Sequence, residues 1–222
     1  MKKILITAGC IILALVLTAA GALVRLRLKT DSINDDYSFI YQDSAYSAPV
    51  YADGVEVITQ DVSCGYAVLE MFADWNGTSG VTEESLYDEY SKVVTSTGKS
   101  FEEQMNLRFP EYDTVMHKYM TNSELVTAVY DSLEQGIPVP CEWAALYEDT
   151  WTLHYSLIIG MDIPNDVVIV ANPYGYTEQI SLSEFLSRMR FDAYENMPLF
   201  LKLGFAFGIF EENTVFIANQ CS

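Results

Sequence analysis

The sequence of 222 residues predicts one α+β domain behind an N-terminal apolar segment. Two observations predict this fold class. Helix-type apolar spacing occurs mainly in the first part of the chain, and strand-type runs come later. Because the two are segregated rather than alternating, they indicate α+β and not a parallel α/β fold. We expect three parts: an apolar segment over 1–29, a polar stalk over 30–54, and a domain over 55–222.

Residues 4–24 form an apolar run of 21 residues without a charge, flanked by basic residues on both sides. As a helix this run spans ~31 Å at ~1.5 Å per residue, which is enough to cross a bilayer. Signal-peptide cores usually measure ~7–15 residues, so we prefer an uncleaved membrane anchor. The small residues at 18–22 keep a cleaved signal peptide as the alternative.

The charge of the chain is unevenly distributed. Five of its 12 basic residues lie in 1–29, where no acidic residue occurs, so residues 30–222 carry 31 acids against seven bases, a net −24. Such a domain repels nucleic acid and anionic membrane surfaces. We expect it outside the cytoplasm, with the membrane contacted through the N-terminal helix, or secreted if that helix is removed.

The first elements of the domain are expected in chain order. Apolar residues at 66, 68–69, 72 and 75 recur at helical spacing, and Asn76-Gly77 ends that helix. Ser123 precedes a similar pattern that stops at Gly136. The expected elements are a strand at 55–58, helices at 64–75, 82–94 and 123–135, and an irregular stretch at 98–120 with some helix in FEEQMNLRF.

The second half predicts a sheet. Residues 137–143 form a strand that Pro138 and Pro140 place near an edge. Residues 154–160 and 167–171 form a hairpin around a turn at 161–166. A short helix over 181–190 follows, and the apolar stretch 199–210 is too short for a membrane span and predicts strands.

Cys64 stands where the first helix of the domain begins, in the stretch QDVSCGYAVLEMF. A free cysteine is often simply a small buried residue. At a helix N-terminus, however, the helix dipole favours the thiolate, which is the nucleophilic form. Gln60, four residues earlier, is an ordinary loop residue by itself, but its amide, with the Cys64 N–H, would stabilise an oxyanion.

His154 is one of only two histidines and begins the first strand of the predicted hairpin. Residues equidistant from a hairpin turn face each other. Asn172 is therefore expected opposite His154, within a residue or two. Its carbonyl would accept the ring N–H, fix the tautomer and leave the other nitrogen for a thiol, although Asn172-Pro173 also reads as an ordinary turn.

The stretches ITQDVSCGYAVLEMF, LEQGIPVPCEW, LHYSLIIGMD and VVIVANPYGYTEQISLSEFL have the order of motifs in papain-like cysteine peptidases. Within them the chain resembles the stand-alone branch of the bacteriocin-processing peptidase family, over about residues 55–190. The resemblance implies a papain-like fold with a Cys64 nucleophile, a His154 base, an Asn172 orienter and a Gln60 oxyanion donor. The family usually has Asp where this chain has Asn172.

The residues leave three functions open: a thiol hydrolase that cleaves peptide or amide bonds, an acyltransferase with the same triad, and a non-catalytic binding module on this scaffold. We expect no cofactor and no metal, since no HExxH or paired Cys-x-x-Cys occurs. Trp143 and Tyr174 are candidate substrate-binding residues, with burial at strand ends as the alternative. One workable cysteine arrangement joins Cys141 to Cys221.

Overall fold

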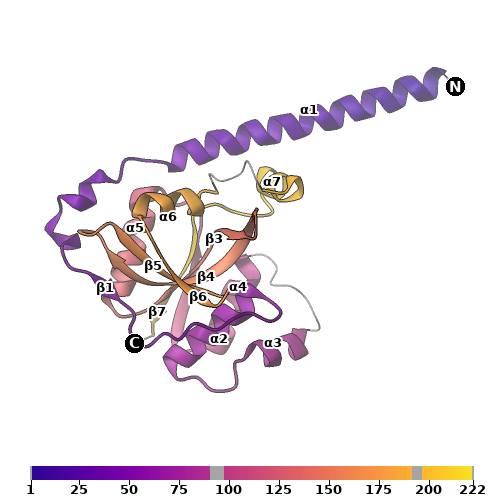
Figure 1. Cartoon of the computed structure of the whole chain (residues 1–222). Coiled ribbons are helices and arrows are strands. Elements are labelled where there is room, and N and C mark those ends of the chain that lie inside the picture. Colours follow the sequence, from indigo (N-terminus) through magenta and orange to yellow (C-terminus); the bar gives the residue numbers. More distant parts are fainter. Residues whose placement is uncertain (1, 91–97, 192–196, 222) are drawn as a thin grey trace.

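The computed structural model describes residues 2–90, 98–191 and 197–221. A long helix, α1 (Lys2–Ile33), projects from a domain in which helices cover both faces of one antiparallel sheet (Figure 1). The α+β prediction is therefore confirmed.

The sheet has seven strands in the order β2-β7-β3-β4-β5-β6, and β1 pairs with β4 outside this path. The strands are β1 (Val50–Tyr51), β2 (Tyr112–His117), β3 (Val139–Tyr147), β4 (Thr150–Asp162), β5 (Val167–Asn172), β6 (Tyr176–Ile180) and β7 (Thr214–Gln220). The longest ladder joins β3 to β4 and runs from Val139↔Ile158 to Tyr147↔Thr150. This hairpin carries His154.

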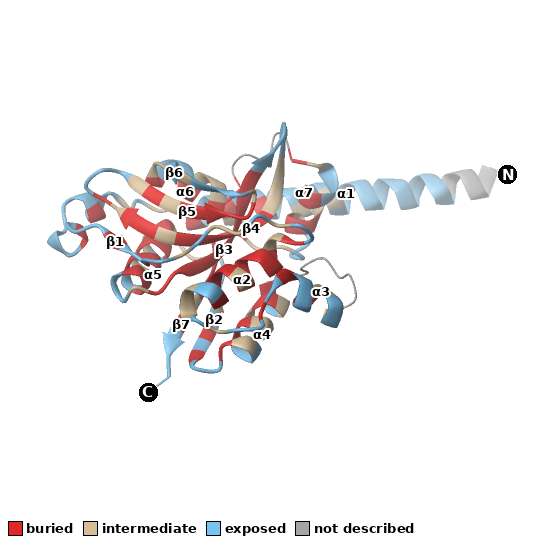
Figure 2. Ribbon diagram, turned by 60° about the horizontal axis from the view of Figure 1, so that its bottom comes forward, coloured by how far each residue is buried: buried red, intermediate tan, exposed pale blue. Residues whose placement is uncertain are grey.

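The two larger apolar cores in the described part of the chain flank the sheet. One lies under α5 (Asn122–Glu134) and α6 (Leu182–Met189), and the other under α2 (Cys64–Asn76), α3 (Glu83–Tyr90) and α4 (Gly98–Arg108). Successive residues of a strand point to opposite faces and therefore into opposite cores. Trp143 lies opposite His154 in the ladder and packs in the first core, whereas the next residue, Tyr155, packs in the second. Figure 2 shows the buried inner surfaces and the exposed length of α1.

Helix boundaries follow local capping chemistry. Gly77 has the left-handed φ of 76° that ends α2, as Asn76-Gly77 predicts. The predicted cap Ser123 is displaced by two residues, because Thr121 and Glu124 form a reciprocal capping box at the start of α5. Gly136, also with φ of 76°, follows the end of α5.

The prediction of an edge position for the strand after Gly136 was wrong. β3 lies between β7 and β4 in the sheet. Pro140 has no N–H to donate, and the β3–β7 ladder contains only Cys141↔Val215 and Glu142↔Thr214. The proline thus limits the pairing on one side of a central strand.

Several other boundaries differ from the expectations. Residues 55–58 are not a strand, and 98–120 contain α4 and β2 rather than mostly irregular chain. The predicted strands over 199–210 are instead α7 (Leu199–Ala206), which buries Leu201 and Phe205 one helical turn apart. The end of the predicted helix over 82–94 falls partly outside the described residues, and β6 and β7 were not predicted.

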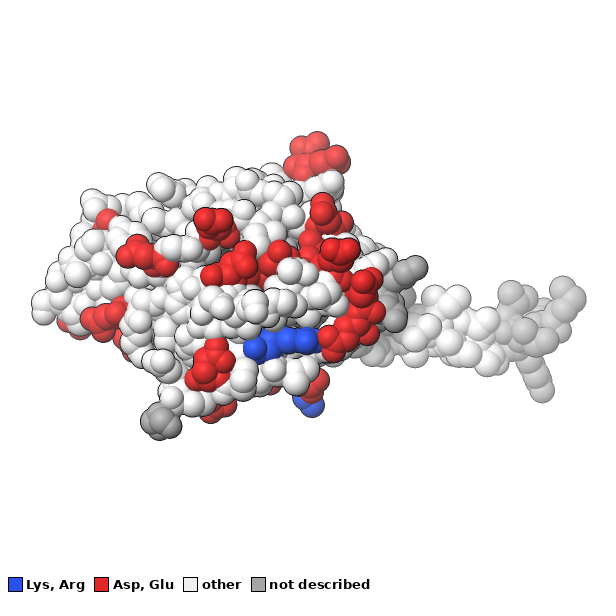
Figure 3. All heavy atoms as spheres, turned by 90° about the horizontal axis from the view of Figure 1, so that it is seen from below, with Lys and Arg blue, Asp and Glu red and all other residues white. Residues whose placement is uncertain are grey.

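Residues 30–54 lie on the domain instead of forming a free stalk. α1 continues to Ile33, and the segment after it buries Ile40 and Tyr46 in the core under α5. One helix of the described chain, near the N-terminus, is long and apolar enough to cross a membrane, and a signal sequence would have the same properties. On the face seen in Figure 3, acidic side chains far outnumber basic ones.

Candidate active site

Cys64 is the first residue of α2 and is only partly exposed. The residue before it, Ser63, has an extended backbone and acts as the N-cap residue. Backbone hydrogen bonds from Tyr155 and Gly65 reach the Cys64 thiol. Since Tyr155 follows His154 directly, α2 brings the thiol to the part of β4 that carries the histidine.

His154 and Asn172 meet as predicted. His154 Nε2 lies 2.9 Å from Asn172 Oδ1, and both residues are buried. The orientation of the Asn172 amide is fixed, because Oδ1 accepts the Tyr174 N–H at 2.9 Å and Nδ2 donates to Glu178 at 2.8 Å. An amide oxygen only accepts, so Nε2 carries the proton and His154 Nδ1 keeps a free lone pair.

Glu178 and Arg188 extend this arrangement, and sequence reasoning missed both. The Arg188 guanidinium lies 2.6 Å from the Glu178 carboxylate, and both side chains are 13% exposed. Arg188 also lies over the rings of Trp143 and Trp151. The turn Asn172-Pro173-Tyr174-Gly175 could have indicated a second hairpin, with a further strand after it. That strand, β6, places Glu178 opposite Val170 of β5.

The resting thiol and imidazole are both neutral. Burial raises the pKa of Cys64 to about 11, against the hydrogen bonds that lower it. Burial lowers the pKa of His154 to about 4, against the raising effect of Asn172. The described hydrogen bonds include none between Cys64 and His154. The helix start therefore does not by itself produce the thiolate that its dipole would favour.

Glu83 holds the loop between Gln60 and Cys64. Its buried carboxylate accepts the N–H groups of Asp61 and Val62, each at 2.7 Å, and that of Ser63. These donors lie at the positive end of the α2 dipole, where a carboxylate is favoured. From the sequence, Glu83 was expected only in the first turn of a helix. Nothing in the sequence indicated that its carboxylate would contact the loop before Cys64.

Gln60 lies beside the Asn172 turn. Its N–H donates to the Pro173 carbonyl at 2.8 Å, and its side-chain oxygen is buried without a partner among the described residues. A cleft of about 510 Å³ is lined by Gln60, Tyr147 and Tyr174, and a second of about 390 Å³ shares these three residues. Gln60 therefore borders both clefts, whose lining includes neither Cys64 nor His154.

The two predicted substrate-binding residues have different surroundings. Tyr174 lines both clefts and stacks on the His154 ring, with centroids 4.2 Å apart and planes at 22°. Trp143 does not line either cleft, because it is fully buried and its Nε1 donates to Ser156 at 3.0 Å. Of the two interpretations of Trp143, burial in the core is therefore the one that the structure supports.

The remaining cysteines do not form the arrangement considered from the sequence. Cys141 is buried, Cys221 is exposed, and both are free thiols. Cys141 pairs with Val215 across β3 and β7, six residues before Cys221, so the two are too far apart along β7 to bond. No cluster of three or more His, Cys, Asp or Glu side chains suited to a metal occurs in the described part of the chain.

A family model described as the Peptidase_C39 like family matches residues 34–197, which is most of the chain. The match contains all four predicted catalytic residues, and it confirms the resemblance inferred from the motifs. Comparisons with curated proteins and with solved structures found no significant match.

Proposed function

Because the chain belongs to the Peptidase_C39 like family, we propose that it is a cysteine peptidase-like hydrolase that cleaves peptide or amide bonds. Cys64 is the nucleophile, His154 the general base, Asn172 the orienting residue and Gln60 the oxyanion donor. The family and its papain-like α+β fold indicate the reaction class, and the roles of the four residues are our assignment.

One observation carries the proposal: His154 is hydrogen-bonded to Asn172 and directly precedes Tyr155, whose backbone contacts the Cys64 thiol. That bond leaves His154 Nδ1 unprotonated, which is the state that a general base requires. The low pKa of His154 has the same consequence, since the ring stays neutral well below neutral pH. A buried structural histidine would not need an amide whose two ends are both held in place.

The proposed reaction has two stages. As Cys64 Sγ bonds to the substrate carbonyl carbon, its proton passes to His154 Nδ1, and the carbonyl oxygen takes the negative charge beside Gln60 and the Cys64 N–H. The C–N bond then breaks, and the leaving amine takes the proton from Nδ1. Water attacks the thioester, gives a proton to Nδ1 and releases the acid, and Cys64 regains its proton.

Because Cys64 and His154 are both neutral before substrate binds, we expect the substrate to take part in activating the thiol. A thiol with a pKa of about 11 is a weak nucleophile at neutral pH. Proton transfer must therefore accompany attack instead of preceding it. Substrate binding in the cleft beside Tyr174 would bring the reacting groups into hydrogen-bond range, as catalytic contacts often tighten only in the complex.

We also place the domain outside the cytoplasm, tethered by α1. The apolar length of α1 and its basic flanks support a retained anchor, and the acidic domain suits an exported protein. The same features fit a cleaved signal peptide, which would make the protein secreted. Peptide mapping of the mature chain distinguishes the two.

The test uses the full chain in detergent and a library of neutral and basic peptides, analysed by mass spectrometry. Cleavage is expected to fall by roughly 10³-fold or more in Cys64→Ser, and to persist in Cys221→Ser, which removes the exposed free thiol. An acyl adduct on Cys64 would be trapped at low pH. Equal cleavage by Cys64→Ser and the parent would refute the assignment.

Two other functions share this site and give different results. An acyltransferase would transfer the acyl group from Cys64 to an added amine, so that an amide product replaces the acid. A non-catalytic binding module is favoured by the absence of a Cys64–His154 hydrogen bond among the described contacts. It would retain peptides without cleavage or adduct, and Cys64→Ser would bind them equally well.

A further inference from the structure

α7 and the turn after it present an apolar surface to solvent. Leu199, Phe200, Phe207 and Ile209 are each more than half exposed. Their neighbours Leu201 and Phe205 point the other way, into a small core. Contiguous exposed aromatic and aliphatic side chains of this kind mark an interaction surface more often than single exposed residues do.

Packing of α1 against α7 determines where the apolar surface of α7 lies relative to the uncharged run of α1. Leu26 of α1 shares a core with Leu201 and Phe205 of α7. The uncharged run of α1 ends at Val24, only two residues, or ~3 Å of helix, from Leu26. The half-buried residues Ala19 and Ala22 continue the packed face of α1 into that run.

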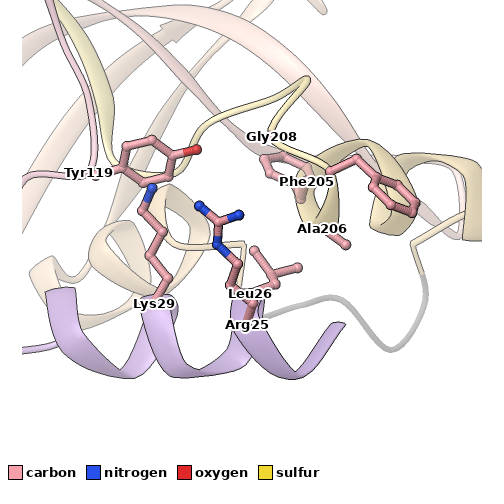
Figure 4. A pocket seen from close by; sticks show the side chains of 8 residues that line it. Arg25, Leu26, Lys29, Tyr119, Phe205, Ala206 and Gly208 are labelled. Atoms are coloured by element: carbon pink, nitrogen blue, oxygen red, sulfur yellow. The ribbon is translucent and has the colours of Figure 1, made fainter. Parts of the chain in front are cut away.

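Figure 4 shows the direction in which α7 lies. Arg25 and Lys29 of α1 extend toward Tyr119, and Lys29 Nζ lies 2.9 Å from the centroid of that ring. Phe205 and Ala206 lie on the N-terminal side of Lys29, toward the apolar run. If α1 crosses a bilayer, α7 is therefore at the level where the hydrocarbon region ends.

The charges near α7 suit this position. Residues 197–210 contain one charged residue, Lys202, and no acid, in a domain that is otherwise strongly acidic. Arg25, Arg27 and Lys29 lie on the adjoining turns of α1. Lysine and arginine are favoured at the headgroup level, with apolar and aromatic side chains just below it.

We propose that the exposed face of α7 and its following turn inserts into the interfacial region of the phospholipid bilayer that α1 spans. The domain then lies directly on the membrane surface. This inference rests on α1 being a retained span. It is compatible with the expectation that the acidic domain repels anionic membrane surfaces, because the proposed contact is local and apolar.

The proposed contact also locates the substrate cleft. Along the start of β4, Trp151 and Leu153 pack against the α7 core, whereas Thr150 and Thr152 line the smaller cleft. One strand therefore separates the cleft from the membrane-facing surface. If the proposed hydrolase activity holds, its substrates are peptide segments that lie close to the bilayer.

The test places a nitroxide spin label at residue 200 or 207 of the full chain. Cys10, Cys64 and Cys221 are changed to serine first, and the buried Cys141 is kept. Each protein is reconstituted in phosphatidylcholine nanodiscs, and intact mass confirms that α1 is present. Collisions with oxygen, which concentrates in lipid, are compared with collisions with a water-soluble nickel chelate.

Two further label sites serve as references. Leu15 in α1 and Leu107 in α4 are both exposed, and only the first lies in the apolar run. The oxygen-to-nickel ratio at 200 and 207 is expected to be several-fold higher than at 107 and lower than at 15, because Leu15 lies near the middle of the apolar run and the interfacial region is shallower.

Three results would overturn the proposal. A ratio at 200 and 207 like that at 107, with a high ratio at 15, means that α1 spans the bilayer but α7 faces water. Low collision rates with both reagents at 200 and 207 mean that protein, such as a second copy, covers the surface. A low ratio at 15 removes the membrane span itself. None of these collision measurements depends on hydrolase activity.

Discussion

Replacing Glu83 tests how the loop before Cys64 is held. In Glu83→Ala, three backbone N–H groups lose their acceptor. Ser63 is buried, so its N–H is left without water, at a cost of about 1–3 kcal/mol. Asp61 and Val62 are exposed, so water replaces the carboxylate there, and together they add only about 1 kcal/mol. The expected loss of unfolding free energy is therefore about 2–4 kcal/mol.

Glu83→Gln separates charge from shape. A glutamine oxygen can keep the bonds to Val62 and Ser63, but its NH₂ group then faces the Asp61 N–H. We expect about half the loss of the alanine variant, since one of three bonds is broken and the other two lose their charge. The adjacent Glu84 is exposed, and Glu84→Gln is the matched control for removal of one negative charge.

The assay combines urea unfolding with hydrogen exchange of the amides at 61–63. Both Glu83 variants should speed exchange at these amides, with little change in the strands of the sheet. If exchange at 61–63 stays at the parent rate and the unfolding free energy falls no more than in Glu84→Gln, the carboxylate does not organise this loop. The account of how Gln60 is positioned would then be wrong.

The remaining predictions concern buried titratable groups and one turn. The pKa of His154 is about 4 in the folded protein against 6.5 for a free histidine, so its contribution to stability is present above pH 6.5. About 3 kcal/mol of unfolding free energy should be lost as pH falls from 6.5 toward 4. Urea titrations should show this loss in the parent and in the control His117→Gln, which changes an exposed histidine, but not in His154→Gln. Burial raises the pKa of Glu142 to about 7, so about 3 kcal/mol of unfolding free energy should be lost as pH rises from 4.5 to 8. Glu142→Gln should not show this loss in urea titrations. An equal pH dependence in the parent and the variant would contradict the burial of Glu142 as an acid. Both Gly54 and Gly175 have positive φ, but only at Gly175 would an added Cβ meet a neighbour, the Thr59 Oγ1 at 2.5 Å. Gly175→Ala should therefore lower the unfolding free energy by about 2 kcal/mol more than Gly54→Ala. Equal melting temperatures of the two variants would contradict this.

The central pairing of the site was predictable from spacing. His154 and Asn172 were expected opposite each other around a turn centred at residue 163. The ladder instead pairs Leu157 with Ala171, and an irregularity between Ile158 and Gly160 shifts the register further. The two side chains still meet, because a displacement of two residues along a strand keeps a residue on the same face.

Other features depend on contacts that local patterns do not encode. The aromatic stretch at 199–210 has the composition of strands, yet α7 forms because Leu201 and Phe205 pack on Leu26, far away in the chain. Tertiary packing commonly overrides local propensity in this way. The contact of Glu83 with the loop before Cys64 likewise arises only when α3 folds against α2.

The place of β7 in the sheet has a consequence for biogenesis. β7 contains residues 214–220 but lies between β2 and β3, and among the described strands β2 pairs with β7 alone. The sheet cannot close until this late segment is available. Under the proposed export of the domain, the native form would be reached only after residues 214–220 had crossed the membrane. Its pairings of large sequence separation also predict slow folding, so the nascent chain would depend on protection during that interval.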